Sequence, residues 1–395
     1  ADAGKKNQAL ICMADHILSA QKEILTANTE DLRQAQAAGI SGAMLDRLSL
    51  NEARIQDMAR GLREVAALPD PVGELESEWV RPNGMRVGRM RVPLGVVGIV
   101  YEARPNVTAD AAGLCLKAGN ASILRGGSES IASNRAIGEA IAAGLRQAGL
   151  PPESVQVIPH TDRQAVSALI TQQGLVDCII PRGGHAFLAW VAQNASVPVI
   201  QHGEGNCHVY VDDPADLTMA EEIVFNGKVQ RPGVCNATET LLVHAQTALA
   251  FLPAVLTRLA KAGVEIRGCE QTRILFPGAR PAVEADWSTE FLDLILAVKV
   301  VSSFADALDH IARYGTGHSE AIVTRDYGHA ERFLKEVDAA AVLVNASTRL
   351  VDGGQFGLGA EIGISTQKLH ARGPMGLREL TSLKFVVRGS GQIRK

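Results

Sequence analysis

Val96-Val-Gly-Ile-Val-Tyr-Glu-Ala-Arg-Pro-Asn-Val-Thr108 consists of a short apolar run, a polar turn and the beginning of a helical pattern. The apolar run at 96–100 is continuous, as expected for a strand whose two faces are both buried in a parallel sheet. Pro105 suits the start of a helix and Asn106 is a fair N-cap, so a helix is predicted over 107–118. A strand, a turn and a helix in this order predict the first half of a βαβ unit.

The same alternation continues from this segment towards the C-terminus. Further strands, with helices between them, are predicted at 122–124, 155–158, 178–180, 197–200 and 208–211. A second series begins after Asn226, with strands predicted at 241–243, 298–301, 321–323 and 342–344. The alternation predicts an α/β fold with two tandem doubly wound domains. A cleft between two such domains is the default place for chemistry.

Upstream of residue 96, a helical pattern extends to Leu68 and is followed by a charged hairpin. Asn83-Gly84 between two extended arms is the strongest short-range hairpin signal, because both residues of a two-residue turn need positive φ. We interpret the hairpin at 76–91, together with the tail at 381–395, as an arm through which a homodimer or homotetramer assembles.

The bulk composition excludes several classes of protein. A formal charge of −4 gives no basic footprint for nucleic acid or for an anionic membrane surface. No apolar run reaches the roughly 18–20 residues that a membrane span requires. The six cysteines form no CxxC pair, so no metal site is predicted, and their scatter favours free thiols in a reducing cytosol. We therefore expect a cytoplasmic globular protein without nucleic-acid or membrane partners.

Cys235 is the first candidate for chemistry, in Val229-Gln-Arg-Pro-Gly-Val-Cys-Asn-Ala237. A cysteine on a loop between two α/β units is accessible to a substrate, and Arg231 nearby would favour the thiolate. The alternative is a buried structural cysteine, and the residues alone leave the two interpretations equally open. Asn106 also has two roles open: a helix cap, or an amide donor that stabilises an oxyanion.

Two segments are candidates for binding phosphate groups, although the sequence contains no GxGxxG fingerprint. Arg125-Gly126-Gly127-Ser128 and Arg182-Gly183-Gly184 each combine a strand end, a basic residue, a glycine pair and a helix start. Bare backbone amides and a helix N-terminus favour anions. Each segment alone is also compatible with an ordinary turn, so the hypothesis rests on finding two of them on successive strands.

Several longer motifs support a family resemblance. The most specific is 301–322, Val-Ser-Ser-Phe-Ala-Asp-Ala-Leu-Asp-His-Ile-Ala-Arg-Tyr-Gly-Thr-Gly-His-Ser-Glu-Ala-Ile. Further matching segments lie at 92–96, 101–108, 230–239, 345–349, 352–358 and 365–374. Together they resemble the aldehyde dehydrogenase superfamily, and specifically its gamma-glutamyl phosphate reductase branch, over nearly the whole chain. The resemblance implies an aldehyde dehydrogenase-like fold with a cofactor-binding domain (1–75, 92–224 and 359–380), a catalytic domain (225–358) and the arm.

The resemblance also implies a reaction. It is the NADPH-dependent reduction of L-glutamyl 5-phosphate to L-glutamate 5-semialdehyde and phosphate, the second step of proline biosynthesis from glutamate. Cys235 would be the nucleophile and would form a thioester, which hydride from NADPH then reduces. Asn106 and the backbone N–H of Cys235 would form the oxyanion hole.

Cofactor and substrate contacts follow from the same resemblance. Arg125 stands where ordinary aldehyde dehydrogenases carry a lysine, and its planar guanidinium suits the 2′-phosphate of NADPH. Gly183 and Gly184 fall where the pyrophosphate loop lies. The residues expected to contact the substrate are Arg104, Arg231, Asn345, Ser347, Thr348 and Arg349.

Two alternatives remain open at this point. A hydrolytic NAD-dependent semialdehyde dehydrogenase needs a glutamate base, and Gln201 stands at that position. A glutamine cannot act as a base, so the residue favours the reductase. A catalytically silent family member that acts as a binding module is the second alternative, and the presence of Cys235 and Asn106 argues against it. Because the acyl phosphate is labile, a transient contact with a glutamate 5-kinase is a further hypothesis.

Overall fold

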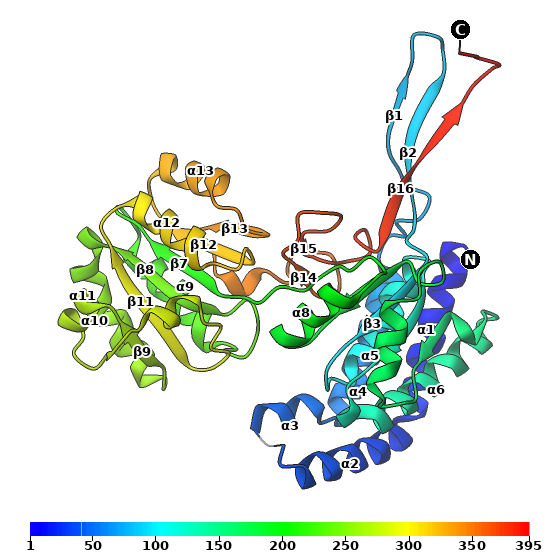
Figure 1. Ribbon diagram of the computed structural model, residues 1–395, viewed down its shortest axis with the longest axis horizontal. Helices are drawn as coiled ribbons and strands as arrows, with labels where there is room; N and C mark the ends of the chain where they lie inside the picture. Colours follow the sequence, from blue (N-terminus) through cyan, green and yellow to red (C-terminus); the bar gives the residue numbers. More distant parts are fainter. Residues whose placement is uncertain (41, 395) are drawn as a thin grey trace. The chain divides into compact units, whose positions relative to one another are not determined.

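The computed structural model describes residues 1–40 and 42–394, except for the side chains of residues 43 and 185. The chain forms two compact units (Figure 1). Unit 1 comprises Ala1–His202, Gly357–Gly363 and Met375–Lys395, and unit 2 comprises Gly203–Phe356 and Ile364–Pro374. Among the described residues, no helix is long and apolar enough to cross a membrane.

Unit 1 contains a parallel sheet in the order β5 (Val155–Val157), β4 (Ala121–Arg125), β3 (Val96–Val100), β6 (Cys178–Pro181). Four predicted strands are thereby confirmed. Residues 197–200 do not form a predicted fifth strand, because only one bridge, Ile179 to Val199, joins them to β6. The chain runs from β3 outward to β5 and then returns to the other side of β3, so the topology reverses between β3 and β6.

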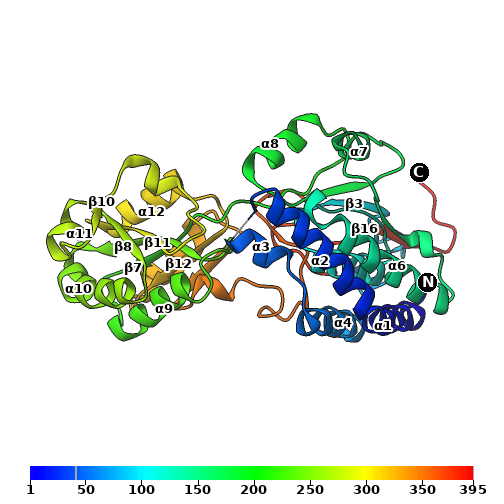
Figure 2. The ribbon, with the colours of Figure 1, turned by 90° about the horizontal axis from the view of Figure 1, so that it is seen from below.

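Helices cover both faces of this sheet (Figure 2), with α7 and α8 on one side and α1, α4 and α6 on the other. The helices of unit 1 are α1 (Ala3–Ser19), α2 (Gln21–Ala37), α3 (Gly42–Leu48), α4 (Glu52–Ala67), α5 (Asn106–Lys117), α6 (Ile131–Gln147), α7 (Arg163–Ile170) and α8 (His185–Asn194). Two short 3₁₀ turns, Ser128–Ser130 and Pro152–Ser154, complete the unit.

The predicted arm is a three-stranded antiparallel sheet of β1 (Leu75–Val80), β2 (Arg86–Pro93) and β16 (Thr381–Arg388). The turn differs from the prediction. Gly84 N–H donates to the Arg81 carbonyl at 2.8 Å, and Gly84 has φ 83° whereas Asn83 does not have positive φ. A turn that places only its last residue in the left-handed region is the usual three-residue hairpin loop. The expectation of positive φ at both residues is therefore wrong.

Unit 2 contains a seven-stranded parallel sheet (Figure 1). Its order is β10 (Arg280–Pro281), β9 (Glu265–Gly268), β11 (Ile295–Val301), β8 (Thr238–His244), β7 (Cys207–Val211), β12 (Ser319–Val323), β13 (Ala341–Val344). Its helices are α9 (Leu217–Val229), α10 (Ala245–Lys261), α11 (Glu270–Leu275), α12 (Phe304–Tyr314) and α13 (Tyr327–Glu336), with 3₁₀ turns at Glu284–Ser288 and Thr348–Leu350. Ile364–Ser365 (β14) pairs with Gly373–Pro374 (β15).

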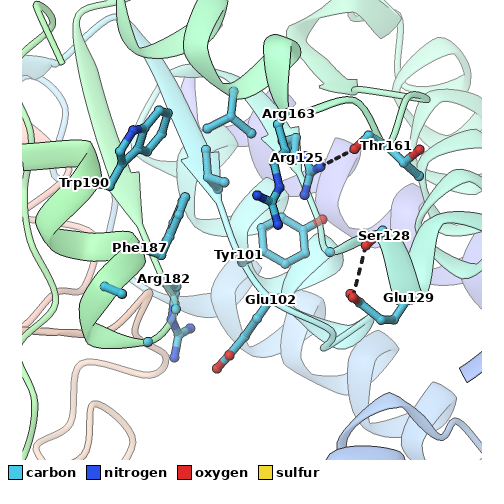
Figure 3. Close-up of a pocket in the computed structure, with 16 residues that line it drawn as sticks. Tyr101, Glu102, Arg125, Ser128, Glu129, Thr161, Arg163, Arg182, Phe187 and Trp190 are labelled. Carbon is cyan, nitrogen blue, oxygen red and sulfur yellow. Dashed lines mark hydrogen bonds between the residues drawn. The ribbon is translucent and has the colours of Figure 1, made fainter. Parts of the chain in front are cut away.

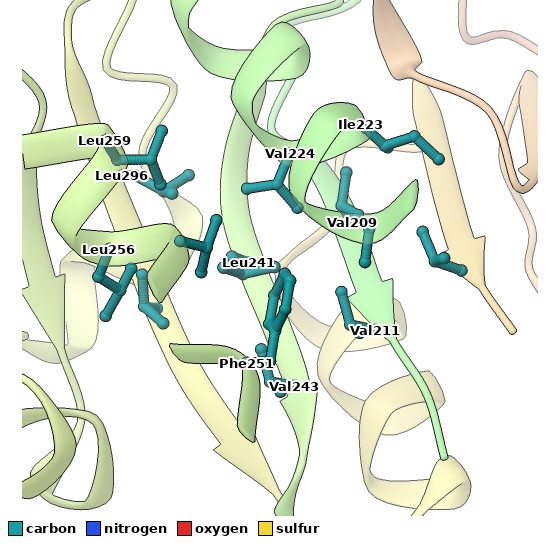
Figure 4. Packing of buried hydrophobic residues seen from close by; sticks show 14 of the residues in the cluster. Val209, Val211, Ile223, Val224, Leu241, Val243, Phe251, Leu256, Leu259 and Leu296 are labelled. Carbon is teal, nitrogen blue, oxygen red and sulfur yellow. The ribbon is translucent and has the colours of Figure 1, made fainter. Parts of the chain in front are cut away.

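Alternating residues of the central strands build two cores, one on each face of the sheet. Val209, Val211, Leu241 and Val243 pack with α9 and α10 (Figure 4), whereas Tyr210 and Leu242 pack with residues of α12 and α13. The continuous apolar runs that predict the strands are therefore explained by burial on both faces.

The pairing of β7 corrects the predicted domain boundary. Residues 207–224 are predicted to belong to the cofactor-binding domain, but β7 pairs with β8 and β12 and belongs to unit 2. The boundary therefore lies after His202, and Ile364–Pro374 also belongs to unit 2. A strand is assigned to a sheet by its neighbours, and the local sequence does not identify them.

Candidate active site

A cavity of about 670 Å³ opens in unit 1 at the carboxyl ends of the parallel strands (Figure 3). Tyr101 and Glu102 follow β3, Arg125 ends β4, and Arg182 follows β6. The cavity thus lies where the topology reverses, which is the usual ligand position in open α/β sheets. Phe187 and Trp190, whose rings are stacked at 6.3 Å, supply an apolar wall from α8.

Arg125 is fixed by its own surroundings. Its two terminal nitrogens donate to the carbonyl oxygens of Gly126 and Thr161, each at 2.9 Å. Its Nε is buried and has no hydrogen-bond partner among the described residues. Burial lowers the pKa of Arg125, and the positive charge of Arg163 adds to this effect. These bonds use two of the five N–H donors of the guanidinium, and a held guanidinium with donors left over, beside a second cation, is suited to an anion.

The two predicted glycine segments both line the cavity. A Cβ at Gly126 would lie 2.0 Å from the Asn134 amide, and one at Gly127 would lie 3.0 Å from the Ala103 nitrogen, so neither position accepts a larger residue. Gly127, Ser128, Gly183 and Gly184 belong to the cavity wall. Ser128 Oγ donates to Glu129 at 3.0 Å.

Arg163 is a cavity residue that sequence reasoning misses. It is the first residue of α7 and is exposed, and it has neither a glycine pair nor a strand end beside it. Only the return of the chain past the end of β4 places it next to Arg125.

Cys235 is partly exposed on the loop between α9 and β8. Both elements belong to unit 2, so the expectation that this loop joins the two α/β units is wrong. The Cys207 thiol donates to the Cys235 carbonyl oxygen at 3.2 Å. A Cβ at Gly205 would lie only 1.5 Å from that oxygen, so glycine is required for the close approach. The backbone around Cys235 is therefore held against the start of β7. None of the six cysteines, all within the described residues, forms a disulfide.

Two arginines lie close to Cys235 in unit 2. Arg349 Nε donates to Gln230 at 2.9 Å, and its guanidinium also contacts the Asn236 side chain. Burial lowers the pKa of Arg349, followed by the positive charge of Arg231, and Arg349 also interacts electrostatically with Cys235. Arg349 is thus held against the loop that carries Arg231 and Cys235, and both residues act on its charge.

The other three residues predicted around Arg349 make bonds inside unit 2. Asn345 has φ 55°, and its side-chain amide bridges the backbone N–H and carbonyl of Thr324 at 3.0 Å each. Ser347 Oγ donates to Asn226 at 2.8 Å, and Thr348 is fully buried. These bonds shape the loop that carries Arg349, and direct substrate contact by the three side chains stays a prediction.

Asn106 and Arg104 lie in unit 1, after β3. The expectation that Asn106 is an N-cap is wrong, because Pro105 is the cap and Asn106 is the first helical residue. Its exposed side chain is thus not occupied in capping and instead donates to Asp110 at 3.1 Å. Arg104 lies 4.0 Å from the Glu102 carboxylate.

Comparisons with known proteins agree with this architecture. The sequence model of the aldehyde dehydrogenase family matches residues 13–274. A gamma-glutamyl phosphate reductase of Moorella thermoacetica is 60% identical over 391 residues, which are 99% of this chain and 94% of the relative. One of Caldanaerobacter subterraneus is 57% identical over 394 residues, covering 100% and 95%. The chain belongs to the gamma-glutamyl phosphate reductase branch of the aldehyde dehydrogenase family.

A solved structure extends this assignment to three dimensions. The gamma-glutamyl phosphate reductase of Thermotoga maritima superimposes with a TM-score of 0.97 at 50% identity, covering 100% of this chain and 95% of the other. A probable aldehyde dehydrogenase of Listeria monocytogenes, 16% identical, shares the fold with a TM-score of 0.72, covering 100% and 93%. The aldehyde dehydrogenase-like fold predicted from the sequence is confirmed.

Proposed function

We propose that this member of the branch reduces L-glutamyl 5-phosphate to L-glutamate 5-semialdehyde and phosphate with NADPH, in the biosynthesis of proline. The observation that carries the proposal is the bonding of Arg349 to the loop that holds Arg231 and Cys235, in a chain 57–60% identical to relatives named for this activity. A nucleophilic sulfur beside two cations is suited to a substrate that carries both an acyl group and a phosphate.

Cys235 performs the first step. Its thiolate attacks the acyl carbon, an S–C bond forms, and the C–O bond to phosphate breaks with its electron pair leaving on the phosphate oxygen. The positive charges of Arg231 and Arg349 favour the thiolate and neutralise the departing phosphate. The product of this step is a thioester on Cys235.

Asn106 acts in the second step. When bound, the reduced nicotinamide would supply the hydride that converts the thioester to the oxyanion of a thiohemiacetal. The Asn106 amide donates to the oxygen on which negative charge develops, as does the backbone N–H of Cys235. Collapse of the thiohemiacetal releases the aldehyde and returns the thiolate.

The residues around the cavity of unit 1 fit a phosphorylated dinucleotide. Arg125 lines the cavity with terminal nitrogens that each keep a second N–H, and Arg163 offers a second guanidinium beside it. Two adjacent arginines match the 2′-phosphate that distinguishes NADPH from NADH. Arg163 is therefore added to the predicted set of Arg125, Gly126, Gly127, Ser128, Gly183 and Gly184.

Replacing Arg163 by alanine is expected to raise the KM for NADPH about 10–100-fold, because a charge-assisted hydrogen bond contributes about 1.5–3 kcal/mol. The KM for NADH and kcat are expected to change little. Initial rates with both cofactors check this, with Arg146→Ala on the exposed face of α6 as the control. An equal effect on both cofactors would show that Arg163 does not contact the 2′-phosphate.

The reverse reaction tests the proposed activity against its alternatives. Formation of NADPH from glutamate semialdehyde is expected to require inorganic phosphate, because phosphate must release the thioester. Reduction without phosphate would identify the hydrolytic alternative and would contradict the interpretation of Gln201. Failure to bind cofactor, with no reaction of Cys235 with an alkylating probe, would identify a silent binding module. A rate gain on adding a glutamate 5-kinase would support the transient contact that we also propose.

We further propose that the arm assembles a homodimer or homotetramer. Trp79 and Phe385 meet edge to face at 6.4 Å, and Phe385 is 67% and Val387 57% exposed. Phe385→Glu combined with Val387→Glu is expected to reduce the mass in solution to that of one chain, because charge cannot be buried against apolar surface without a large cost. Light scattering measures the mass, and Lys384→Glu on the opposite strand face is the control. An unchanged mass would exclude this face of the arm.

A further inference from the structure

The side chain of Asn106 makes a hydrogen bond that no function described so far uses. Asn106 is exposed at the start of α5, where a short amide side chain is free to occupy several rotamers. Its Nδ2 donates to Oδ2 of Asp110, one turn further along the same helix, at 3.1 Å. An amide nitrogen has two N–H groups, so this bond leaves the second one available and restricts its direction.

Asp110 itself interacts with two other parts of unit 1. A Cβ at Gly61 would lie 3.8 Å from Asp110 Oδ1, so the backbone of α4 passes close to the carboxylate. The charge of Arg182, from the segment after β6, acts on the same group. Asp110 is therefore partly buried beside α4, and the positive charge of Arg182 acts on it.

Burying the Asp110 carboxylate costs free energy, which a neutral hydrogen-bond acceptor at this position would avoid. Burial raises the pKa of Asp110 to about 6, while the hydrogen bond from Asn106 and the charge of Arg182 oppose this rise. An alanine, serine or asparagine at position 110 would avoid burying a carboxylate. An ionised carboxylate makes a charge-assisted bond to the amide, about twice as strong as a neutral one.

Arg182 connects this group to the cofactor cavity. It lines the cavity beside Gly183 and Gly184, and it is also the cation that acts on Asp110. Asp110, Asn106 and Arg182 all belong to unit 1.

We propose that Asp110 is a positioning residue, which holds the Asn106 amide so that its second N–H is directed at the oxygen of the reacting acyl group. This inference rests on the proposed function, because it takes Asn106 as the oxyanion donor. Asp110 does not touch the substrate and acts through Asn106 alone.

A double-mutant cycle tests the inference. Asp110→Ala is expected to lower kcat about tenfold with little change in KM. A displaced oxyanion donor loses part of the roughly 10²–10³-fold increase in kcat that such a donor contributes. In an Asn106→Ala background, the same change is expected to cost less than about twofold, because no amide remains to be positioned. Glu139→Gln, on the exposed face of α6, is the control for loss of one negative charge.

The conservative variant gives a second, independent readout. The carbonyl oxygen of an asparagine at position 110 accepts the same N–H, so Asp110→Asn is expected to keep kcat within about threefold of the wild type at pH 8. Asp110 is ionised above its pKa of about 6 and loses its charge below it. The kcat advantage of the wild type over Asp110→Asn is therefore expected at pH 8, and it is expected to disappear as the pH decreases through about 6.

The outcomes separate the inference from the proposed function. If Asn106→Ala and Cys235→Ser both retain activity, the proposed function fails. If those two variants lose activity but Asp110→Ala does not, the positioning role is overturned. It is also overturned if Asp110→Ala lowers kcat by the same factor in the presence and in the absence of Asn106. Should Asp110→Ala not fold, the cycle is run with Asp110→Asn at pH 8, where the wild type is ionised and is expected to be the faster enzyme. An equally large difference in the Asn106→Ala background would overturn the positioning role.

Discussion

Replacement of Cys235 by serine is expected to reduce the reductase activity about 10⁴-fold or more. A serine hydroxyl has a pKa far above that of a thiol, so nearby positive charge cannot produce an alkoxide at neutral pH. The phosphate-dependent reduction of NADP⁺ by glutamate semialdehyde measures the loss. Retention of more than about one per cent of the activity would exclude Cys235 as the nucleophile.

Cys269 provides a matched control for this variant. It is the other partly exposed cysteine of the chain, on the α11 side of the same sheet. Its sulfur contacts Thr272 Oγ1 at 3.3 Å and accepts from the Val300 N–H at 3.4 Å. Cys269→Ser preserves both contacts and is expected to leave the activity unchanged. Mass spectrometry after a limited alkylation should find the label on Cys235 first.

Lys228→Met is expected to lower the free energy of unfolding by about 3–5 kcal/mol, because removing one partner of a buried ion pair leaves the other charge uncompensated. Lys228 and Glu239 are both completely buried, with Nζ and Oε2 2.6 Å apart. Lys228 is near the end of α9 and Glu239 near the start of β8, so the pair closes the base of the loop that carries Cys235. Urea denaturation measures the stability, and activity should fall with it.

The pH dependence of this loss has a definite sign. Burial raises the pKa of Glu239, and the attraction of Lys228 opposes the rise, so removing Lys228 raises the pKa further. A carboxyl whose pKa is higher in the folded state costs stability as pH rises above its unfolded value, through the folded value. The destabilisation by Lys228→Met is therefore expected to be larger at pH 8 than at pH 5.

A double variant controls for the packing of Lys228. Glu239→Gln removes the orphaned charge, and the Gln oxygen can still accept from the Leu292 N–H, as Glu239 Oε1 does at 3.2 Å. Lys228→Met combined with Glu239→Gln is expected to recover most of the lost stability, because replacing a whole buried pair by uncharged groups is often neutral. No recovery would show that packing, and not the unpaired charge, causes the loss.

The parts of the fold that the sequence predicts correctly are those that depend on residues adjacent in the chain. The apolar run at 96–100 is a buried strand because its side chains face apolar layers on both sides, and the helix after it begins at Asn106. The placement of Cys235 between a helix and a strand follows from the same local alternation. The glycine segments at 125–128 and 182–184 reach one cavity because the carboxyl ends of parallel strands share one edge of a sheet.

Long-range contacts decided the rest. The sequence of β7 is compatible with a strand in either domain. Only its pairing with β8 and β12 assigns it to unit 2. Arg163 lies beside Arg125 across a stretch of chain whose sequence carries no mark of the neighbour, whereas Arg349 was expected near Cys235 only through the family resemblance. Local periodicity follows from the rise and rotation of a single helix or strand, whereas these pairings depend on the order in which strands enter a sheet. That order is set by the packing of whole layers, and it became visible only in the tertiary structure.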